Sequence, residues 1–193
     1  MMPMKNKDYI IFDLDGTLVD SYPTIINACK RVLKEFAPSL LPSEQFFNTY
    51  LGKEIEQLFI DMAKISNLSL DEFRRKYDEQ YAHDFLSGSS IINKQFKILT
   101  EAKAKGIGII VLTNKKQELA ERVCEKLLGN SLIDIIIGRK DSTPIKPRHV
   151  IIERLHDCGI KQLSQCIKYY GDSKSDLETA QLLRIEYINT KFV

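Results

Sequence analysis

The chain is organised around the stretch Tyr9-Ile10-Ile11-Phe12-Asp13-Leu14-Asp15-Gly16-Thr17-Leu18. It begins as an apolar run rich in β-branched and aromatic residues, which predicts a strand buried on both faces. Because residues i and i+2 of an extended chain point the same way, we expect Asp13 and Asp15 to lie close together at the carboxyl end of this strand, where open α/β sheets bind ligands. A divalent cation, or a proton on one carboxylate, is then needed to offset their repulsion. Asp-Gly is also a common turn dipeptide, so the stretch alone does not establish a function.

Residues 18–86 have the apolar spacing of amphipathic helices, and no strand is expected among them. The first helix should end before Pro38, and Ser43 should cap the next one. The last helix of the segment is expected to carry four aromatic residues, Phe73, Tyr77, Tyr81 and Phe85. The basic run Arg74-Arg75-Lys76 is interpreted as a solvent-exposed face of that helix. The segment is therefore predicted to be an all-helical insertion.

After the linker Ser87-Gly88-Ser89-Ser90, helical and strand patterns alternate. The predicted strands are residues 107–113, 133–137, 166–170 and 186–189. The predicted helices are residues 93–105, 115–128, 147–158 and 173–184. Strands separated by helical patterns of about 10–15 residues indicate right-handed βαβ units and a parallel sheet. We therefore expect an α/β fold, a doubly wound parallel sheet formed by residues 1–18 and 87–193, with the helical residues 19–86 inserted directly after the two aspartates.

Composition limits the classes of protein to which the chain can belong. Its 193 residues are 44% hydrophobic, which suits one domain with an insertion and a substantial core. A net charge of +2 argues against nucleic acid as a partner, and no uncharged apolar run approaches the ~18 residues of a membrane span. The start of the chain lacks the apolar core of a signal peptide, so a cytoplasmic protein without membrane contact is expected. Four cysteines without Cys-x-x-Cys spacing are interpreted as buried, reduced thiols rather than disulfides or zinc ligands: Cys29, Cys124, Cys158 and Cys166.

Three further polar clusters follow a predicted strand or lie beside one. Thr113-Asn114-Lys115 offers a hydroxyl and backbone N–H groups at an expected helix N-terminus, which is an anion site by geometry and dipole. Asp172 and Asp176 follow the fourth strand and can converge across a tight turn. Lys146 precedes Pro147, which suits the first turn of a helix. Singly, these are also explained as a helix cap, acids at a helix start or a solvated lysine, but their joint order is far more specific.

The order D-L-D-G-T, strand-T-N, K-P and G-D-x-x-x-D resembles the haloacid dehalogenase-type hydrolase superfamily over residues 8–190. Within it, F-D-L-D-G-T-L-V-D-S and V-L-T-N-K are most similar to the phosphoglycolate phosphatase and β-phosphoglucomutase branch. The helical segment resembles the α-helical cap of that family, and the remainder its Rossmann-like hydrolase core. One departure is Leu183-Arg184-Ile185, which lacks the glycine often found before the family's last strand.

The resemblance implies a role for each of the four aspartates. Asp13 would be the nucleophile that becomes an aspartyl-phosphate, and Asp15 would act as acid and then as base. Magnesium would be held by Asp13, the Asp15 backbone carbonyl and Asp172, and Asp176 would support the metal or its waters. A carboxylate that attacks a phosphate dianion meets a repulsion of about 4 kcal/mol per unit-charge pair at ~4 Å and a dielectric near ~20, which a divalent cation and a lysine offset. An all-oxygen site suits magnesium.

The resemblance also implies the groups that bind the substrate. Thr113, the Asn114 backbone N–H and Lys146 would hold the phosphoryl oxygens. Gly52 and Lys53, in the helical segment, would face the substrate by their placement alone. The ligand and partner implied is a small phosphorylated metabolite.

These roles imply a magnesium-dependent phosphatase that hydrolyses a small phosphomonoester, either phosphoglycolate-like or a sugar phosphate, through an aspartyl-phosphate. Asp15 argues against the dehalogenase and phosphonate-cleaving branches, which lack an aspartate at this position. A β-phosphoglucomutase-like phosphomutase would use the same aspartates, and a non-catalytic binding protein on the same scaffold is the alternative from another class. The T-N-K segment favours hydrolysis. A monomer or weak homodimer is expected.

Overall fold

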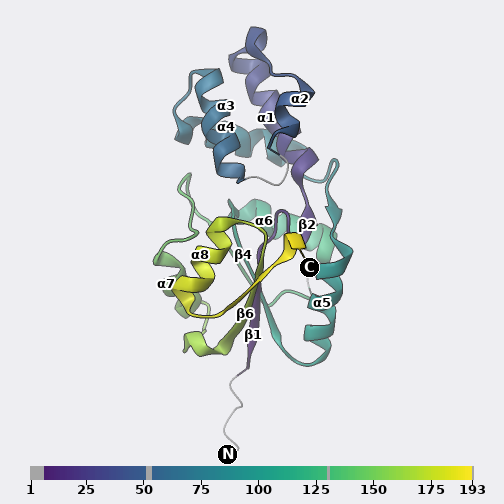
Figure 1. The fold of residues 1–193 in the computed structure, drawn as a ribbon, viewed down its shortest axis with the longest axis vertical. Coiled ribbons are helices and arrows are strands. Elements are labelled where there is room, and N and C mark those ends of the chain that lie inside the picture. The colour runs from purple at the N-terminus through teal and green to yellow at the C-terminus, as the bar shows by residue number, and fades with distance from the viewer. Residues whose placement is uncertain (1–6, 51–53, 130, 193) are drawn as a thin grey trace, which may run out of the picture.

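A five-stranded parallel sheet forms the centre of the computed structural model, which describes residues 7–50, 54–129 and 131–192 (Figure 1). The strands, in the spatial order β5-β4-β1-β6-β7, are β5 (Ile135–Arg139), β4 (Gly108–Lys116), β1 (Tyr9–Phe12), β6 (Cys166–Gly171) and β7 (Glu186–Asn189). Every neighbouring pair in this sheet is parallel, so the predicted parallel α/β sheet is confirmed. The central strand, β1, is the apolar run that precedes the two aspartates.

Helices cover both faces of the sheet because β1 is apolar on both sides. Ile10 and Phe12 belong to the same hydrophobic cluster as residues of α5 (Asn93–Ala104) and α6 (Gln117–Val123). Ile11, which points the other way, belongs to the cluster that contains residues of α7 (Val150–Asp157) and α8 (Lys174–Leu183). Alternate residues of the strand therefore supply two separate cores, as expected of a strand buried on both faces.

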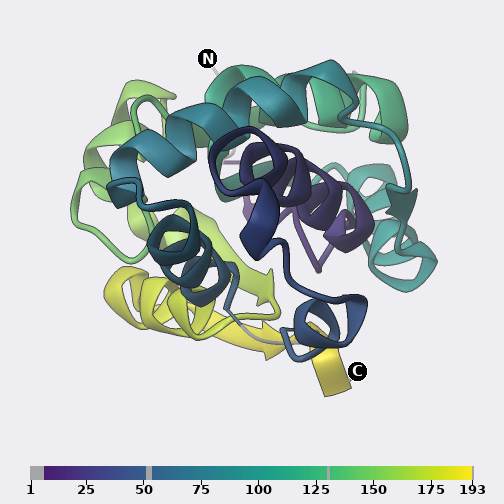
Figure 2. The same cartoon turned by 90° about the horizontal axis from the view of Figure 1, so that it is seen from above.

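Four further helices lie beyond the carboxyl end of β1 (Figures 1 and 2). They are α1 (Tyr22–Phe36), α2 (Glu44–Asn48), α3 (Ile55–Ser66) and α4 (Leu70–His83). We refer to them as the helical layer. Apolar residues at helical spacing on α1 are buried against α3 and α4, and Ser69 with Glu72 forms a capping box that starts α4. The expected end of the first helix before Pro38 and the expected cap at Ser43 are both confirmed.

The prediction that residues 18–86 contain no strand is wrong at one point. β2 (Val19–Asp20) pairs antiparallel with β3 (Ser90–Ile91), which takes the last residue of the expected linker. The two segments that connect the sheet to the helical layer run side by side here, and the Ile92 N–H also donates to the Leu18 carbonyl. The backbone N–H and C=O groups of the two segments hydrogen-bond to each other, and a local sequence pattern does not reveal such a pairing.

Several element boundaries also differ from the predictions. β4 continues to Lys116 and β5 to Arg139, because these two residues pair across the sheet beyond the apolar run. The predicted helix 115–128 therefore begins at Gln117, and its last turn is a π-helix (Cys124–Leu128). α4 ends at His83, so Phe85 lies outside it. Short 3₁₀ segments occupy Pro38–Leu40, Leu163–Gln165 and Thr190–Phe192.

The last edge of the sheet forms although its preceding connection has no glycine. Arg184 takes the left-handed conformation, with φ at 57°, and ends α8. β7 then pairs along its whole length with β6. All four cysteines are free, and Cys29, Cys124 and Cys166 are buried as expected, whereas the expectation of burial is wrong for Cys158, which is exposed. Within the residues described, no helix is long and apolar enough to cross a membrane.

Candidate active site

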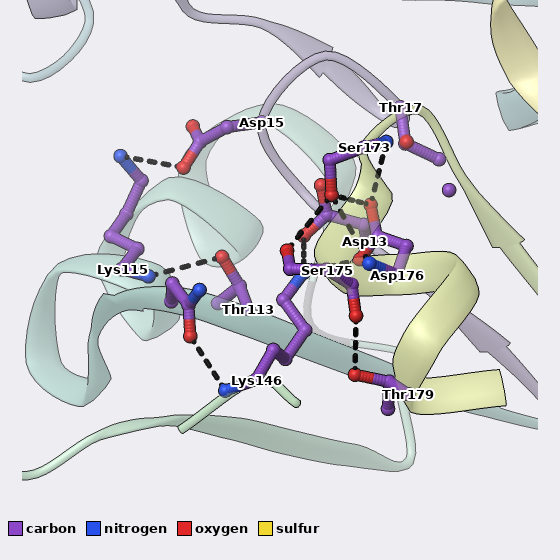
Figure 3. Close-up of polar contacts among 12 residues, drawn as sticks. Asp13, Asp15, Thr17, Thr113, Lys115, Lys146, Ser173, Ser175, Asp176 and Thr179 are labelled. Atoms are coloured by element: carbon purple, nitrogen blue, oxygen red, sulfur yellow. Dashed lines mark hydrogen bonds and ion pairs between the residues drawn. The ribbon is translucent and has the colours of Figure 1, made fainter. Parts of the chain in front are cut away.

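Three carboxylates meet at the carboxyl end of the sheet, and Figure 3 shows two of them, Asp13 and Asp176. Asp13 directly follows β1, Asp172 directly follows β6, and Asp176 lies in the first turn of α8. Each offers a carboxylate oxygen within 4.8 Å of the others. The sequence therefore placed these three residues correctly at one edge of the sheet, as parallel strands require.

A buried lysine joins two of the three carboxylates. The Lys146 ammonium group donates to Asp13 Oδ1 and to Asp176 Oδ1, both at 2.6 Å, and its side chain is only 3% exposed. Burial by itself lowers the pKa of Lys146, but the Asp13 and Asp176 carboxylates outweigh it and raise that pKa above its ordinary value. Lys146 is therefore a cation inside the cluster, positioned against Asp13.

The carboxylates themselves are in unequal environments. Burial, and then the charge of Asp176, raise the pKa of Asp13 well above its ordinary value, against the opposing effect of Lys146. Burial also acts to raise the pKa of Asp176, but Lys146 and hydrogen bonds from Ser173 and Tyr169 lower it overall. Asp176 therefore serves as the ionised anchor for Lys146 and for the start of α8.

Asp172 is the carboxylate that fits a metal ion best. Burial, and then Asp176, raise its pKa to about 6. Among the described residues it accepts no hydrogen bond, and its cationic neighbour, Lys191, lies 3.8 Å away. Gly16 provides the space for it, since a Cβ there would lie 2.7 Å from Asp172 Oδ2. A half-buried carboxylate that accepts no hydrogen bond from the described residues, within 4.8 Å of a carboxylate oxygen of Asp13, matches the donor set of a hard divalent cation.

Asn114 holds the loop that carries Lys146. Its side-chain Oδ1 accepts hydrogen bonds from the backbone N–H groups of Ile145 and Lys146, both at 2.9 Å. These bonds fix the segment before Pro147, and residues 146–147 form a turn closed by a hydrogen bond from the Arg148 N–H to the Ile145 carbonyl, so the expected helix begins at Val150 and not at Pro147. The expected helix N-terminus at residues 113–115 is also absent, because the chain remains in β4 there. Thr113 and Asn114 nevertheless line the same cavity as Asp13.

Asp15 has different partners from Asp13. Its Oδ2 lies 3.1 Å from the ammonium group of Lys115, and its Oδ1 accepts a hydrogen bond from Ser21. β1 ends at Phe12, before either aspartate, so strand alternation does not align the two side chains. Each of the two carboxylates has a lysine of its own, and the divalent cation expected to offset their charges stays a prediction.

The cavity above these residues has a volume of about 550 Å³. One wall is the carboxyl end of the sheet, and the other comes from α3 and α4 of the helical layer, with Phe59 and Tyr77 among its apolar residues. A pocket of this size suits a small molecule, and a mixed polar and apolar lining is typical of such sites. A ligand held against Asp13 would therefore lie in a cavity that the helical layer also lines.

Comparison with known proteins agrees with this geometry. The sequence profile described as haloacid dehalogenase-like hydrolase matches residues 10–190. The chain belongs to this family. The predicted resemblance and the predicted enzyme class, a phosphatase of the haloacid dehalogenase-like type, are confirmed.

Two curated proteins illustrate the similarity. The chain is 28% identical over 181 residues to a "Phosphoglycolate phosphatase" of Aquifex aeolicus, which covers 89% of this chain and 79% of that protein. It is 30% identical over 170 residues to a "Putative pyrophosphatase PpaX" of Clostridium perfringens, with 87% and 76% covered.

Two solved structures share the fold of this haloacid dehalogenase-like chain. A "predicted phosphoglycolate phosphatase" from Haemophilus somnus superposes with a TM-score of 0.75 at 23% identity, covering 97% of this chain and 86% of that one. A "putative beta-phosphoglucomutase" from Thermotoga maritima superposes with a TM-score of 0.66 at 20% identity, covering 94% and 84%.

Two arginines in the cavity of this haloacid dehalogenase-like protein were not predicted as site residues. Arg74 is buried, so the interpretation of residues 74–76 as a solvated face is wrong for it; it donates to the Ser142 carbonyl at 2.8 Å and pairs with Glu56. Arg139 is also buried and pairs with Asp78 of α4. The three- and four-residue spacing from Arg74 to Tyr77 and Tyr81 was the available signal, because it puts Arg74 on the apolar stripe.

Two predicted substrate-facing residues remain predictions. Gly52 and Lys53 lie outside the residues that the structure describes. The adjoining Glu54 is described, lines the cavity and accepts a hydrogen bond from the Lys174 backbone N–H at 2.5 Å. The described end of this segment therefore contacts the start of α8, beside Asp172.

Proposed function

We propose that this protein is a magnesium-dependent phosphatase that hydrolyses a small phosphomonoester through an aspartyl-phosphate on Asp13. One observation carries the proposal: a buried carboxylate, Asp13, shares the lysine Lys146 with Asp176 and lies within 4.8 Å of a carboxylate oxygen of Asp172. This arrangement puts an ammonium group beside the proposed nucleophile and leaves an excess of carboxylates, whose negative charge a divalent cation would offset as a phosphoryl group approaches.

The reaction proceeds in two displacements. Asp13 Oδ2, which accepts no hydrogen bond among the described residues, forms a bond to phosphorus while the bond from phosphorus to the leaving oxygen breaks. Asp15 supplies the proton that the leaving oxygen takes. A water then attacks phosphorus, the bond to Asp13 breaks, and Asp15 accepts the proton of that water. Asp15 thus regains the proton that it donates in the next cycle.

The remaining residues hold the phosphoryl group and its charge. Lys146 faces the phosphoryl oxygens from the side of Asp13, and Thr113 with the Asn114 backbone N–H binds the others. Asp13, Asp172 and the Asp15 carbonyl would hold Mg²⁺, with Asp176 in support, and the ion would supply positive charge to the phosphoryl oxygens. Attack on a phosphate dianion needs this, since each unit-charge pair costs about 4 kcal/mol at ~4 Å and a dielectric near ~20.

We further propose that residues 19–86 act as a cap that selects the leaving group and excludes water from the site. The cavity, which α3 and α4 line together with the sheet, supports this assignment. A phosphoglycolate-like or sugar phosphate substrate is favoured, in line with the names of similar proteins. A cytoplasmic monomer or weak homodimer that binds this metabolite completes the proposal.

Phosphate release from a panel of small esters, with and without magnesium, tests the proposal directly. The panel contains 2-phosphoglycolate, several sugar phosphates and pyrophosphate. We expect magnesium-dependent release that Asp13→Asn abolishes and that Asp157→Asn, a change of the same kind at an exposed site, leaves intact. Turnover that survives Asp13→Asn would exclude this nucleophile.

Product analysis separates the alternatives. A phosphomutase would return the phosphoryl group to a sugar phosphate and yield an isomeric ester instead of inorganic phosphate. A non-catalytic binding protein would bind an ester and magnesium without turnover. Inorganic phosphate as the product excludes both.

A further inference from the structure

Lys115 is a second buried lysine of the cavity, and the steps above do not use it. Its side chain is 3% exposed, as for Lys146, and its ammonium group pairs with Asp15 instead of Asp13 (Figure 3). A buried ammonium group paired with a carboxylate is costly to separate from that partner, so the contact between Lys115 and Asp15 is expected to persist.

We propose that Lys115 is a positioning residue that holds the Asp15 carboxylate apart from the carboxylates of Asp13, Asp172 and Asp176. The proposal rests on the acid–base role given to Asp15 above. A carboxylate whose oxygens coordinate a metal ion is not available to exchange a proton with a leaving oxygen or with water. Lys115 supplies a competing positive charge on the other side of Asp15.

The contacts of Asp15 support this separation. Lys115 and Ser21 each contact a different oxygen of the carboxylate, so both oxygens are held away from Asp13. Asp13 and Asp176 contact Lys146, and no described lysine or arginine bridges the two groups. The site thus contains two cationic centres, one for the nucleophile and one for the acid–base carboxylate.

Tyr81 keeps Lys115 in this position. The Lys115 ammonium group lies 3.9 Å from the centroid of the Tyr81 ring, a cation–π contact inside the protein. Tyr81 belongs to α4 and is itself buried. The ammonium group is therefore confined between an aromatic ring of the helical layer and a carboxylate of the core.

Lys115→Met tests the proposal, with Lys116→Met as the matched control. Lys116 is the next residue, is 37% exposed at its side chain and pairs only with Glu118 among the described residues. With 4-nitrophenyl phosphate, whose leaving group needs no proton, we expect Lys115→Met to release a burst of about one nitrophenolate per site and then turn over slowly, because only attack by water still depends on Asp15. With an alkyl phosphate such as 2-glycerol phosphate, kcat should fall at least about tenfold with no burst.

A double variant distinguishes positioning from a purely structural role. If Lys115 acts through Asp15, adding Lys115→Met to Asp15→Asn should lower the rate no further. The double variant also removes the charges of Lys115 and Asp15 together, so neither is left buried without its partner and the fold is kept. Additive losses, or equal loss of both kinetic phases in Lys115→Met, would overturn the proposal. If Asp15→Asn itself has no effect, the proposed acid–base role fails, which is a separate result.

Discussion

At the scale of the residue, Gly16 leaves the space in which Asp172 approaches Asp13 and Asp176. Its φ is 82°, and an added Cβ would lie 2.7 Å from a carboxylate oxygen of Asp172. We expect Gly16→Ala to weaken magnesium binding at least about tenfold, because displaced carboxylates lose affinity for the ion. Titration of phosphatase activity against magnesium measures the change.

Gly106→Ala is the matched control for this prediction. Gly106 has a φ of 79°, but a Cβ there has no neighbour within 4 Å. Both substitutions should therefore cost about 1 kcal/mol in backbone strain, and only Gly16→Ala should shift the magnesium requirement. Equal magnesium requirements in the two variants would mean that Asp172 does not bind the ion.

At the scale of the element, Arg184 ends α8 in a conformation that favours glycine. Its φ of 57° places a side chain where L-residues are strained. We expect Arg184→Gly to raise the free energy of unfolding by about 0.5–1 kcal/mol, measured by urea denaturation, since Gly removes that strain but adds freedom to the unfolded chain. Arg184→Ala keeps the strain and should bring no gain. A gain of the same size in both variants would assign the effect to loss of the arginine side chain.

A second prediction at this scale concerns Asp134, at the start of β5. It accepts hydrogen bonds from Lys7, Lys103 and the Ile109 backbone N–H, at 2.8, 2.7 and 2.8 Å. Burial acts to raise the pKa of Asp134, but the lysines and the Ile109 N–H lower it below its ordinary 3.8. A lowered pKa means that the folded state binds this proton less readily than the unfolded state. The carboxylate therefore stabilises the fold above about pH 4, and this stability is lost as the pH falls through the lowered pKa.

Asp134→Asn should therefore reduce the pH dependence of stability. Between about pH 6 and about pH 3, the free energy of unfolding of the wild type should fall more than that of the variant, as measured by denaturant titration. Asp157→Asn, at an exposed residue, is the control and should follow the wild type. Parallel curves for wild type and Asp134→Asn would contradict the prediction.

At the scale of the whole molecule, a buried ion pair connects the helical layer to the sheet. Arg139, at the end of β5, pairs with Asp78 of α4, and the two side chains are 5% and 13% exposed. Asp78→Asn leaves the buried Arg139 charge without its carboxylate, which is costly. We therefore expect faster hydrogen exchange of α4 amides, and a higher KM if the layer serves as the cap.

Asp84→Asn is the control for this effect. Asp84 pairs with Arg31 inside the helical layer, at 3.0 Å, and its side chain is 43% exposed. Loss of that pair should leave the attachment of the layer to the sheet unchanged. Equal acceleration of exchange in both variants would show that Asp78 stabilises α4 itself and not its attachment.

The sequence alone was sufficient for the elements whose apolar pattern is local. The buried strand before Asp13, the fifth strand at 186–189 and the parallel pairing of the strands were predicted from the length of the apolar runs, their spacing and the glycines between them. The sequence also predicted that Asp13, Asp172 and Asp176 lie together, because motifs that follow parallel strands must meet at one edge of the sheet.

Only the tertiary structure revealed the contacts made between distant segments. The pairing of β2 with β3, the hold of Asn114 on the Lys146 loop and the burial of Arg74 all join residues that local spacing does not connect. The ion pair between Lys115 and Asp15 is another such contact between distant segments. Periodicity reports which face of an element is apolar, whereas the partner of a buried charge depends on which elements pack together, and that is a property of the folded chain.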